Sequence, residues 1–563
     1  RIVYGVMQNE LLLNWYLSAY CTQKLDHLQP PLSDILRIGA YQILFLDKVP
    51  DHAAVSESVE LCRTNGRSAA SGLVNAVLRK VAQNKSNLPP LPEGNFARLS
   101  VAYSHPQWLV KKLVSLLGVE EAEAFLRIDN EASPISVQVN PLKTNEKALV
   151  DELRGEGVCV TPHPWVPGCL ELSGTGDLTT LSAFYNGRFT VQDAAAHLIV
   201  CAADFARGQR VLDVCAAPGG KTTLYASLAG PDGLVVANEI DRRRAQVLAD
   251  NVRKWGTGNV AVTTCEARQL GGFEAWFDVV AVDAPCSGEG MFRKDRDARG
   301  EWSEGNVKLC AARQDELLRE AWRALKPGGV LIYSTCTFNR DEDEGALERM
   351  LGWAEDEAAQ AGEVAVDASW GIVCGRVGAF RTFRFYPHRA RGEGFFAAVV
   401  RKAFDAGGRC RTPKARRTVF ASVERAAAAE LRRWVNSPER MCFVTVADTC
   451  YGYYVAQAEA VKALAEALPV IYSGVAMGQL FKGRLRPDPA LAFFCGLNRD
   501  AVPAAELDEE QTLRFLRRQE IGAGPFAEGI NLVCARGRAL GFAKRIGNRV
   551  NNMYPNSLRI IKQ

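Results

Sequence analysis

Several common features are missing from this sequence, and each absence narrows the class of protein. The 16 cysteines are scattered along 563 residues without the C-x-x-C spacing of zinc ligands. We expect no secretory leader, and reduced thiols in the cytoplasm rather than a disulfide framework or a metal site. No uninterrupted apolar run is long enough to cross a bilayer, so a membrane protein is not expected.

The sequence also has no large excess of positive or negative charge. The chain has 68 Lys and Arg residues against 64 Asp and Glu residues, a net charge of only +4. Any surface that binds nucleic acid must therefore be a local basic patch. The sequence has no fixed-period repeat and is too long for one hydrophobic core, so we expect about three to five domains. It begins at Arg1 without a methionine, and we expect its true N-terminus to be missing.

The first part of the chain is predicted to be helical. Apolar residues recur at helical spacing up to about residue 86, as Val74 and Val77 do. The Pro-rich segment at 87–94 then indicates a boundary. We therefore assign residues 1–86 to an all-α domain and residues 95–185 to a small α+β module.

The middle of the chain alternates short apolar strands with helices, which is typical of a doubly wound parallel sheet. The expected strands are Arg210–Val214, Leu234–Asn238, Val260–Thr264, Asp278–Asp283 and Val330–Ser334. We therefore predict an α/β, Rossmann-like core at 186–403. A basic linker and helical module at 404–468 and an α+β module at 469–563 would follow it.

A glycine turn directly after the first of these strands has the geometry of a nucleotide site. Its residues are Cys215, Ala216, Ala217, Pro218, Gly219, Gly220 and Lys221. Glycines let a backbone approach a ligand, although many α/β folds use them there only to turn tightly. Glu239 ends the second strand, where an acid can bind ribose hydroxyls, and Glu266 follows the third, near the adenine edge. Because no Walker sequence is present, we predict adenosine binding without phosphates.

Two cysteines follow neighbouring strands of the predicted sheet. Cys286 comes just after Asp283, and Cys336 follows the next strand, so both lie at the carboxyl edge where such sheets bind ligands. A thiolate that adds to carbon 6 of cytosine turns carbon 5 into a nucleophile able to take a methyl group. Asp283 can then hydrogen-bond the N3 edge, while Cys286 helps to remove the carbon 5 proton. A lone cysteine after a strand is more often packing, but the pair favours catalysis.

The motifs around these residues resemble the Sun family of RNA cytosine-5 methyltransferases. They are Ala-Ala-Pro-Gly-Gly-Lys-Thr at 216–222, Asp-Ala-Pro-Cys-Ser-Gly at 283–288 and Ser-Thr-Cys-Thr at 334–337. The resemblance implies that Cys336 is the nucleophile and Cys286 the product-release cysteine. It also implies an S-adenosyl-L-methionine site formed by residues 215–221, Glu239, Glu266 and Asp283. The family usually has Asp at the position of Glu266, and one branch has Asp at that of Glu239.

The flanking regions resemble two branches of that family. The N-terminal helices resemble the NusB-like RNA-binding domain of the RsmB branch, with the first helix or two truncated. The chain from Gly288 onward resembles the RsmF branch, whose PUA-like RNA-binding end is similar to residues 541–549. The chain is thus either a natural fusion or an assembly of two genes, with a junction near residues 190–215.

These resemblances imply methylation of carbon 5 of cytosine in RNA, with 16S ribosomal RNA favoured over tRNA as the substrate. A non-catalytic RNA-binding or ribosome-assembly factor is the alternative. Enzymes that act on DNA or on amines are disfavoured by the Thr-Cys pair at 335–336. We expect a monomer that needs neither metal nor membrane.

The C-terminal tail is locally basic and suits contact with an RNA backbone, or equally a solvated face. Its basic residues are Lys544, Arg545, Arg549, Arg559 and Lys562, and Tyr554 would be available for stacking on a base.

Overall fold

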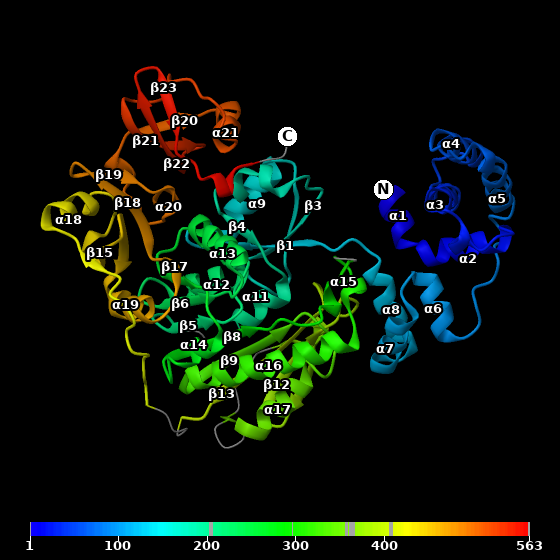
Figure 1. Ribbon diagram of the computed structural model, residues 1–563, viewed down its shortest axis with the longest axis horizontal. Helices are drawn as coiled ribbons and strands as arrows, with labels where there is room; N and C mark the ends of the chain where they lie inside the picture. The colour runs from blue at the N-terminus through cyan, green and yellow to red at the C-terminus, as the bar shows by residue number, and fades with distance from the viewer. Residues whose placement is uncertain are drawn as a thin grey trace. The chain divides into compact units, whose positions relative to one another are not determined.

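The computed structural model describes residues 2–201, 206–294, 297–354, 358–359, 366–404 and 409–560. The chain divides into two compact units, Arg1–Ala132 and Ser133–Gln563 (Figure 1). In the described residues no helix is both long enough and apolar enough to span a bilayer.

The first unit is all helical: it contains the helices expected at 1–86 and also three helices between residues 95 and 129, a stretch assigned from the sequence to the α+β module. Its helices are α1 (Ile2–Gln8), α2 (Glu10–Tyr20), α3 (Pro30–Phe45), α4 (Asp51–Thr64), α5 (Ser71–Gln83), α6 (Asn95–Tyr103), α7 (Gln107–Leu117) and α8 (Val119–Asp129). The apolar stripe of α5, including Val74 and Val77, is fully buried against α2, α3 and α4. Pro30 stands in the first turn of α3, where its missing N–H leaves no helical hydrogen bond unmade.

The second unit begins with a small antiparallel sheet in the order β2-β3-β1-β4. Its strands are β1 (Ile135–Val139), β2 (Cys159–Pro162), β3 (Cys169–Ser173) and β4 (Phe189–Val191), and α9 (Glu146–Gly155) packs on it. These elements are the α+β part of the module expected at 95–185. Leu149 and Leu153 of α9 and Val137 of β1 share one buried core.

The large sheet contains the predicted parallel strands in the order β9-β8-β5-β6-β7. Their bounds are β5 (Arg210–Asp213), β6 (Leu234–Asn238), β7 (Val260–Thr263), β8 (Phe277–Asp283) and β9 (Leu325–Thr335). The order reverses between β5 and β8, and ligands bind at such a switch point in open α/β sheets. The predicted doubly wound, Rossmann-like core is therefore confirmed.

Helices cover both faces of this sheet (Figure 1). They are α11 (Ala194–Cys201), α12 (Gly220–Ala229), α13 (Arg242–Trp255), α14 (Ala267–Gly271), α16 (Glu304–Ala324) and α17 (Glu344–Ala354). Successive strand residues point to opposite faces. Val211 therefore packs in the core that contains α11, α12 and α13 residues, and Leu212 in the core that contains α16 and α17 residues.

Four further strands that the sequence pattern did not indicate extend the sheet at both edges. They are β11 (Val373–Val377), β12 (Phe380–Phe385), β13 (Phe395–Lys402) and β17 (Val470–Ser473). The first three continue the sheet beyond β9, and β17 pairs antiparallel with β7 at the opposite edge. The C-terminal part of the chain is thus hydrogen-bonded directly to the core.

Two more sheets follow, in the orders β14-β15-β16-β18-β19 and β20-β21-β22-β23. Their strands are β14 (Ala421–Ser422), β15 (Met441–Val446), β16 (Thr449–Tyr454), β18 (Val475–Phe481), β19 (Arg484–Pro487), β20 (Ala504–Leu507), β21 (Gly529–Ala535), β22 (Arg538–Ile546) and β23 (Arg549–Asn552). The associated helices are α18 (Arg425–Arg432), α19 (Ala458–Ala467), α20 (Pro489–Phe493) and α21 (Glu509–Leu516). The module expected at 404–468 thus contains strands as well as helices.

Candidate active site

Three of the parallel strands deliver polar residues to one edge of the large sheet. β5 ends at Asp213 and β8 at Asp283, while Cys336 directly follows β9. The parallel register pairs Asp283 with Ser334, so the two strand ends lie side by side. Cys286, three residues beyond Asp283, faces Cys336 across this edge.

The sulfur atoms of Cys286 and Cys336 lie 3.3 Å apart, within hydrogen-bond distance, and both side chains are half-buried. The hydrogen bond from Cys286 lowers the pKa of the Cys336 thiol, against the opposing effects of burial and of Asp283. The same bond, together with burial, raises the pKa of Cys286 well above its ordinary value. The pair therefore holds one proton on Cys286 and favours a thiolate at Cys336, the form that reacts as a nucleophile.

A lysine and a carboxylate stand beside the cysteine pair. Lys221 Nζ donates to Asp283 Oδ2 at 2.7 Å, and Ser334 Oγ donates to Asp283 Oδ1 at 2.7 Å. Burial alone would lower the pKa of Lys221, but Asp283 and Asp213 raise it above its ordinary value. The resulting ammonium group also helps to lower the pKa of Cys336.

The two cysteine loops are clamped together by a buried carboxylate that sequence reasoning missed. Glu342 Oε2 accepts from the Ser287 backbone N–H at 2.9 Å and from Gln314 Nε2 at 3.0 Å. Gln314 also donates to the carbonyl of Pro285 at 3.0 Å. Glu342 is fully buried, and burial raises its pKa. No local sequence pattern indicates this clamp, because its partners come from separate segments.

A second buried network fixes the strand end before Cys336. Thr335 Oγ1 donates to Asp343 Oδ1 at 2.6 Å, and Arg384 Nη1 donates to Asp343 Oδ2 at 2.8 Å. Asp343 is fully buried and Arg384 is 6% exposed. Arg384 lies on β12, so one of the unpredicted strands supports the position of the predicted nucleophile.

The glycine turn after β5 leads into α12, as expected. Gly219 has a φ of 110°, which strains any residue with a side chain, and a Cβ there would lie 2.8 Å from Leu248. A Cβ on Gly220 would collide with Gln192. The chain thus needs both glycines to bring its backbone around the end of β5.

The rest of the turn is held from the neighbouring elements. Ala216 N–H donates to the Asn238 carbonyl at 2.8 Å, and Asn251 Nδ2 donates to the Pro218 carbonyl at 2.9 Å. Cys215 is half-buried beside them, and burial raises its pKa. The predicted loop residues 215–221 therefore form one continuous, tightly bonded turn.

The two acids predicted to contact the ribose and the adenine, Glu239 and Glu266, differ in burial. Glu239 is 4% exposed just beyond β6, where its Oε1 accepts from the Asp241 N–H at 3.0 Å. Arg244 lies 3.4 Å from Glu239 Oε2 and also donates to the Ala217 carbonyl at 3.1 Å, so it joins Glu239 to the turn. Glu266 is exposed, and it caps the first turn of α14.

One buried acid in this region has unused hydrogen-bonding capacity. Asp213 is 1% exposed, its Oδ2 accepts from Thr222 Oγ1 at 2.7 Å, and its buried Oδ1 has no partner within the described residues. Burial raises its pKa to about 7. An orphaned buried oxygen, a glycine turn and an acid at the next strand end together fit the polar groups of a nucleoside. Among the described residues no group of three or more His, Cys, Asp or Glu side chains could hold a metal ion.

The basic tail differs from the sequence-based expectation in one respect. Tyr554 is only 3% exposed and packs on Phe515, so the expected stacking on an RNA base is wrong. Arg545 donates to backbone carbonyls of its own module, whereas Lys544 and Arg549 are exposed. Lys562 lies outside the described residues.

Four family descriptions match successive parts of the chain. They are the NusB family at residues 1–83, the ferredoxin-like domain of RsmF/B-like methyltransferases at 105–179, 16S rRNA methyltransferase RsmB/F at 200–401 and the methyltransferase RsmF PUA domain at 502–560. The expected resemblance to both branches is therefore confirmed.

Curated relatives and a solved structure cover most of the same region. The probable ribosomal RNA small subunit methyltransferase B of Bacillus subtilis is 32% identical over 353 residues, 62% of this chain and 78% of the relative. The protein of that name from Synechocystis is 30% identical over 408 residues, 72% of this chain and 90% of the relative. The crystal structure of PH0851 is 28% identical, with a TM-score of 0.58 over 71% of this chain and 88% of that one.

Proposed function

The chain belongs to the RsmB/F family of ribosomal RNA small subunit methyltransferases, and from this premise we propose that it methylates carbon 5 of a cytosine in 16S ribosomal RNA through a covalent adduct on Cys336. The observation that carries the proposal is the 3.3 Å contact between the sulfurs of Cys286 and Cys336 beside Lys221 and Asp283. A methyl transfer to an amine would need no thiol pair at this edge.

In the first step the Cys336 thiolate adds to carbon 6 of the flipped-out cytosine. The sulfur–carbon bond forms while the electron pair of the C5=C6 bond moves onto carbon 5 and into the ring. Asp283 would face the N3 edge, and Lys221, which is hydrogen-bonded to it, would offset the negative charge that develops there. Carbon 5 is then nucleophilic enough to be methylated.

S-adenosyl-L-methionine, when bound, would supply the electrophilic methyl group. Residues 215–221, Glu239 and the orphaned oxygen of Asp213 are the groups that would hold it, with Glu266 as an outer contact. Gly219 and Gly220 keep side chains out of the turn that would approach it.

In the last step the proton on carbon 5 is removed, the C5=C6 bond re-forms and the bond to Cys336 breaks. Cys286 would accept that proton as a thiolate, after its own proton has passed to solvent. Once the Cys336 sulfur is bonded to the ring, it is no longer a thiolate that accepts a hydrogen bond from the Cys286 thiol. The largest cause that raises the pKa of Cys286 is then removed.

The test separates the roles of the two cysteines. The purified protein and its Cys286→Ala and Cys336→Ala variants are incubated with 16S ribosomal RNA and S-adenosylmethionine labelled in the methyl group. Covalent protein–RNA species are then resolved on a denaturing gel. We expect an adduct that accumulates with Cys286→Ala, because release is blocked, and none with Cys336→Ala.

Cys374→Ala is the matched control, because Cys374 is an exposed thiol on β11 outside the site. It should transfer label like the unmodified protein. If label is transferred to a tRNA transcript and not to 16S RNA, the proposed substrate is wrong but the proposed mechanism stands. RNA binding without transfer or adduct in the unmodified protein would overturn the proposal in favour of a binding-only factor.

A further inference from the structure

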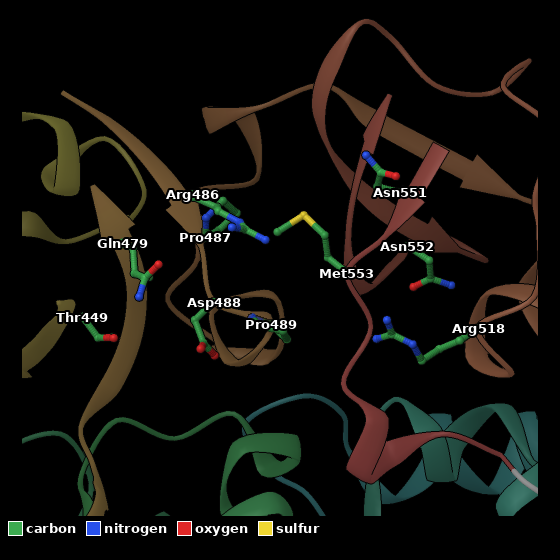
Figure 2. A pocket seen from close by; sticks show the side chains of 11 residues that line it. Thr449, Gln479, Arg486, Pro487, Asp488, Pro489, Arg518, Asn551, Asn552 and Met553 are labelled. Carbon is green, nitrogen blue, oxygen red and sulfur yellow. The ribbon is translucent and has the colours of Figure 1, made fainter. Parts of the chain in front are cut away.

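A polar pocket outside the catalytic edge lies between the last two sheets of the chain (Figure 2). Its volume is about 390 Å³, within the range of small-ligand sites of roughly 300–1,000 Å³. One wall comes from β18 and β19, and the other from β23 and the segment that follows α21. In the described residues β19 and β23 are the outermost strands of their sheets, so the pocket opens between two free sheet edges.

Two arginines line this pocket from opposite walls. Arg486 is exposed on β19, and its side chain makes no hydrogen bond or ion pair within the described part of the chain. Arg518 follows α21 and donates to the Tyr554 carbonyl, which leaves most of its N–H groups available. Figure 2 shows both side chains extending toward the same space around Met553. Two such groups suit the oxygens of a phosphate.

The remaining lining suits a base more than a second anion. Asn551 and Gln479 have amide groups with no partner among the described residues, and each amide offers a donor and an acceptor. Met553 contributes an apolar, polarisable surface between them. Asp488 is the carboxylate of the lining, but its Oδ1 already accepts from the Ala490 N–H at 2.8 Å, and burial raises its pKa. Positive charge therefore predominates.

We propose that this pocket binds one unpaired nucleotide of the RNA substrate, away from the nucleotide that is methylated. Arg486 and Arg518 would hold its phosphate, the Asn551 amide would meet the base edge, and Met553 would contact the base face. The inference rests on the proposed function, because it assigns a second contact to the same RNA. It also gives a role to a surface that the reaction at Cys336 does not use.

The test measures the affinity of the full-length protein for a short unpaired oligoribonucleotide over a range of salt concentrations. Arg486→Ala should weaken binding about 5- to 10-fold and lower the slope of log affinity against log salt by about 0.7, the value of one phosphate contact on a single strand. Arg486→Lys should keep that slope. Asn551→Ala should weaken binding with the slope unchanged, because an amide carries no charge.

Arg432→Ala is the matched control, since Arg432 is an exposed arginine on α18 that does not line the pocket. It should leave both affinity and slope as they were. If Arg486→Ala binds RNA with the affinity and slope of the unmodified protein, the pocket proposal is wrong. Because methyl transfer at saturating RNA is measured separately, a failure of the catalytic proposal would show as no transfer by the unmodified protein.

Discussion

At the scale of single residues, the reactivity of Cys336 depends on the thiol beside it. The Cys286 hydrogen bond is the largest cause that lowers the pKa of Cys336, while burial acts in the opposite direction. Cys286→Ala should therefore raise the pKa of Cys336 and shift the pH profile of its alkylation by iodoacetamide to higher pH. Mass spectrometry of the Cys336 peptide gives the rate at each pH. The exposed-thiol variant Cys374→Ala should keep the original profile, and an unshifted profile in Cys286→Ala would contradict the assignment.

His197 on α11 gives a prediction about stability against pH. Burial, and after it the nearby His163, lower the pKa of His197 to about 4. The unfolded chain has a histidine pKa of about 6.5, so between these values the folded state binds fewer protons than the unfolded state. The contribution of neutral His197 to the free energy of unfolding is therefore fully present above about pH 6.5 and is lost as the pH falls to about 4. The loss amounts to about 3 kcal/mol at most.

His197→Leu should remove this part of the pH dependence. Urea unfolding followed by tryptophan fluorescence at about pH 7.5 and about pH 5 should show a smaller loss of unfolding free energy in the variant than in the unmodified protein. His52→Leu changes an exposed histidine in the other unit and serves as the control. Equal losses in all three proteins would mean that His197 does not titrate in this window.

At the scale of elements, the loops that follow β8 and β9 approach each other too closely for a side chain. A Cβ on Gly290 would lie 2.6 Å from the Gly394 carbonyl oxygen and 2.9 Å from that of Cys336. Both are backbone atoms, so Gly290→Ala should cost about 1–3 kcal/mol of stability and displace Cys336, the proposed nucleophile. We expect a lower single-turnover methylation rate at saturating RNA. Gly305→Ala, whose Cβ would have its nearest neighbour 3.8 Å away, should keep the rate.

The predictable elements are those whose pattern is local. Strands β5 to β9 are short apolar runs that end in turn residues, and their motifs placed Cys286, Cys336, Asp283 and the glycine turn correctly at one edge. Strands β11, β12, β13 and β17 are antiparallel additions whose partners depend on tertiary packing. The same holds for Glu342, whose partner Ser287 is 55 residues away. No local pattern contains such a pairing.

At the scale of the whole second unit, the C-terminal module is joined by ion pairs to the end of α9, the helix that packs on the small sheet of that unit. Arg536 lies 3.0 Å from Glu156, and Arg538 pairs with Glu152. Glu152 is 11% exposed on its side chain, and Arg188 also contacts it. A part of the chain that matches the RsmF/B-like ferredoxin-like domain thus contacts a part that matches the RsmF PUA domain. Whether the chain arose as a fusion or not, these two parts fit each other electrostatically.

This contact gives a prediction about how the modules dock. The double variant Arg536→Glu and Arg538→Glu should place four acids together and weaken the docking of the C-terminal module, because Glu152 and Glu156 would then face like charges instead of arginines. Limited proteolysis should then cut the chain between α20 and β20 faster than in the unmodified protein. Adding Glu152→Arg and Glu156→Arg restores opposite charges and should restore resistance. Resistance that stays high in the double variant would show that the apolar core of this region holds the module without the ion pairs.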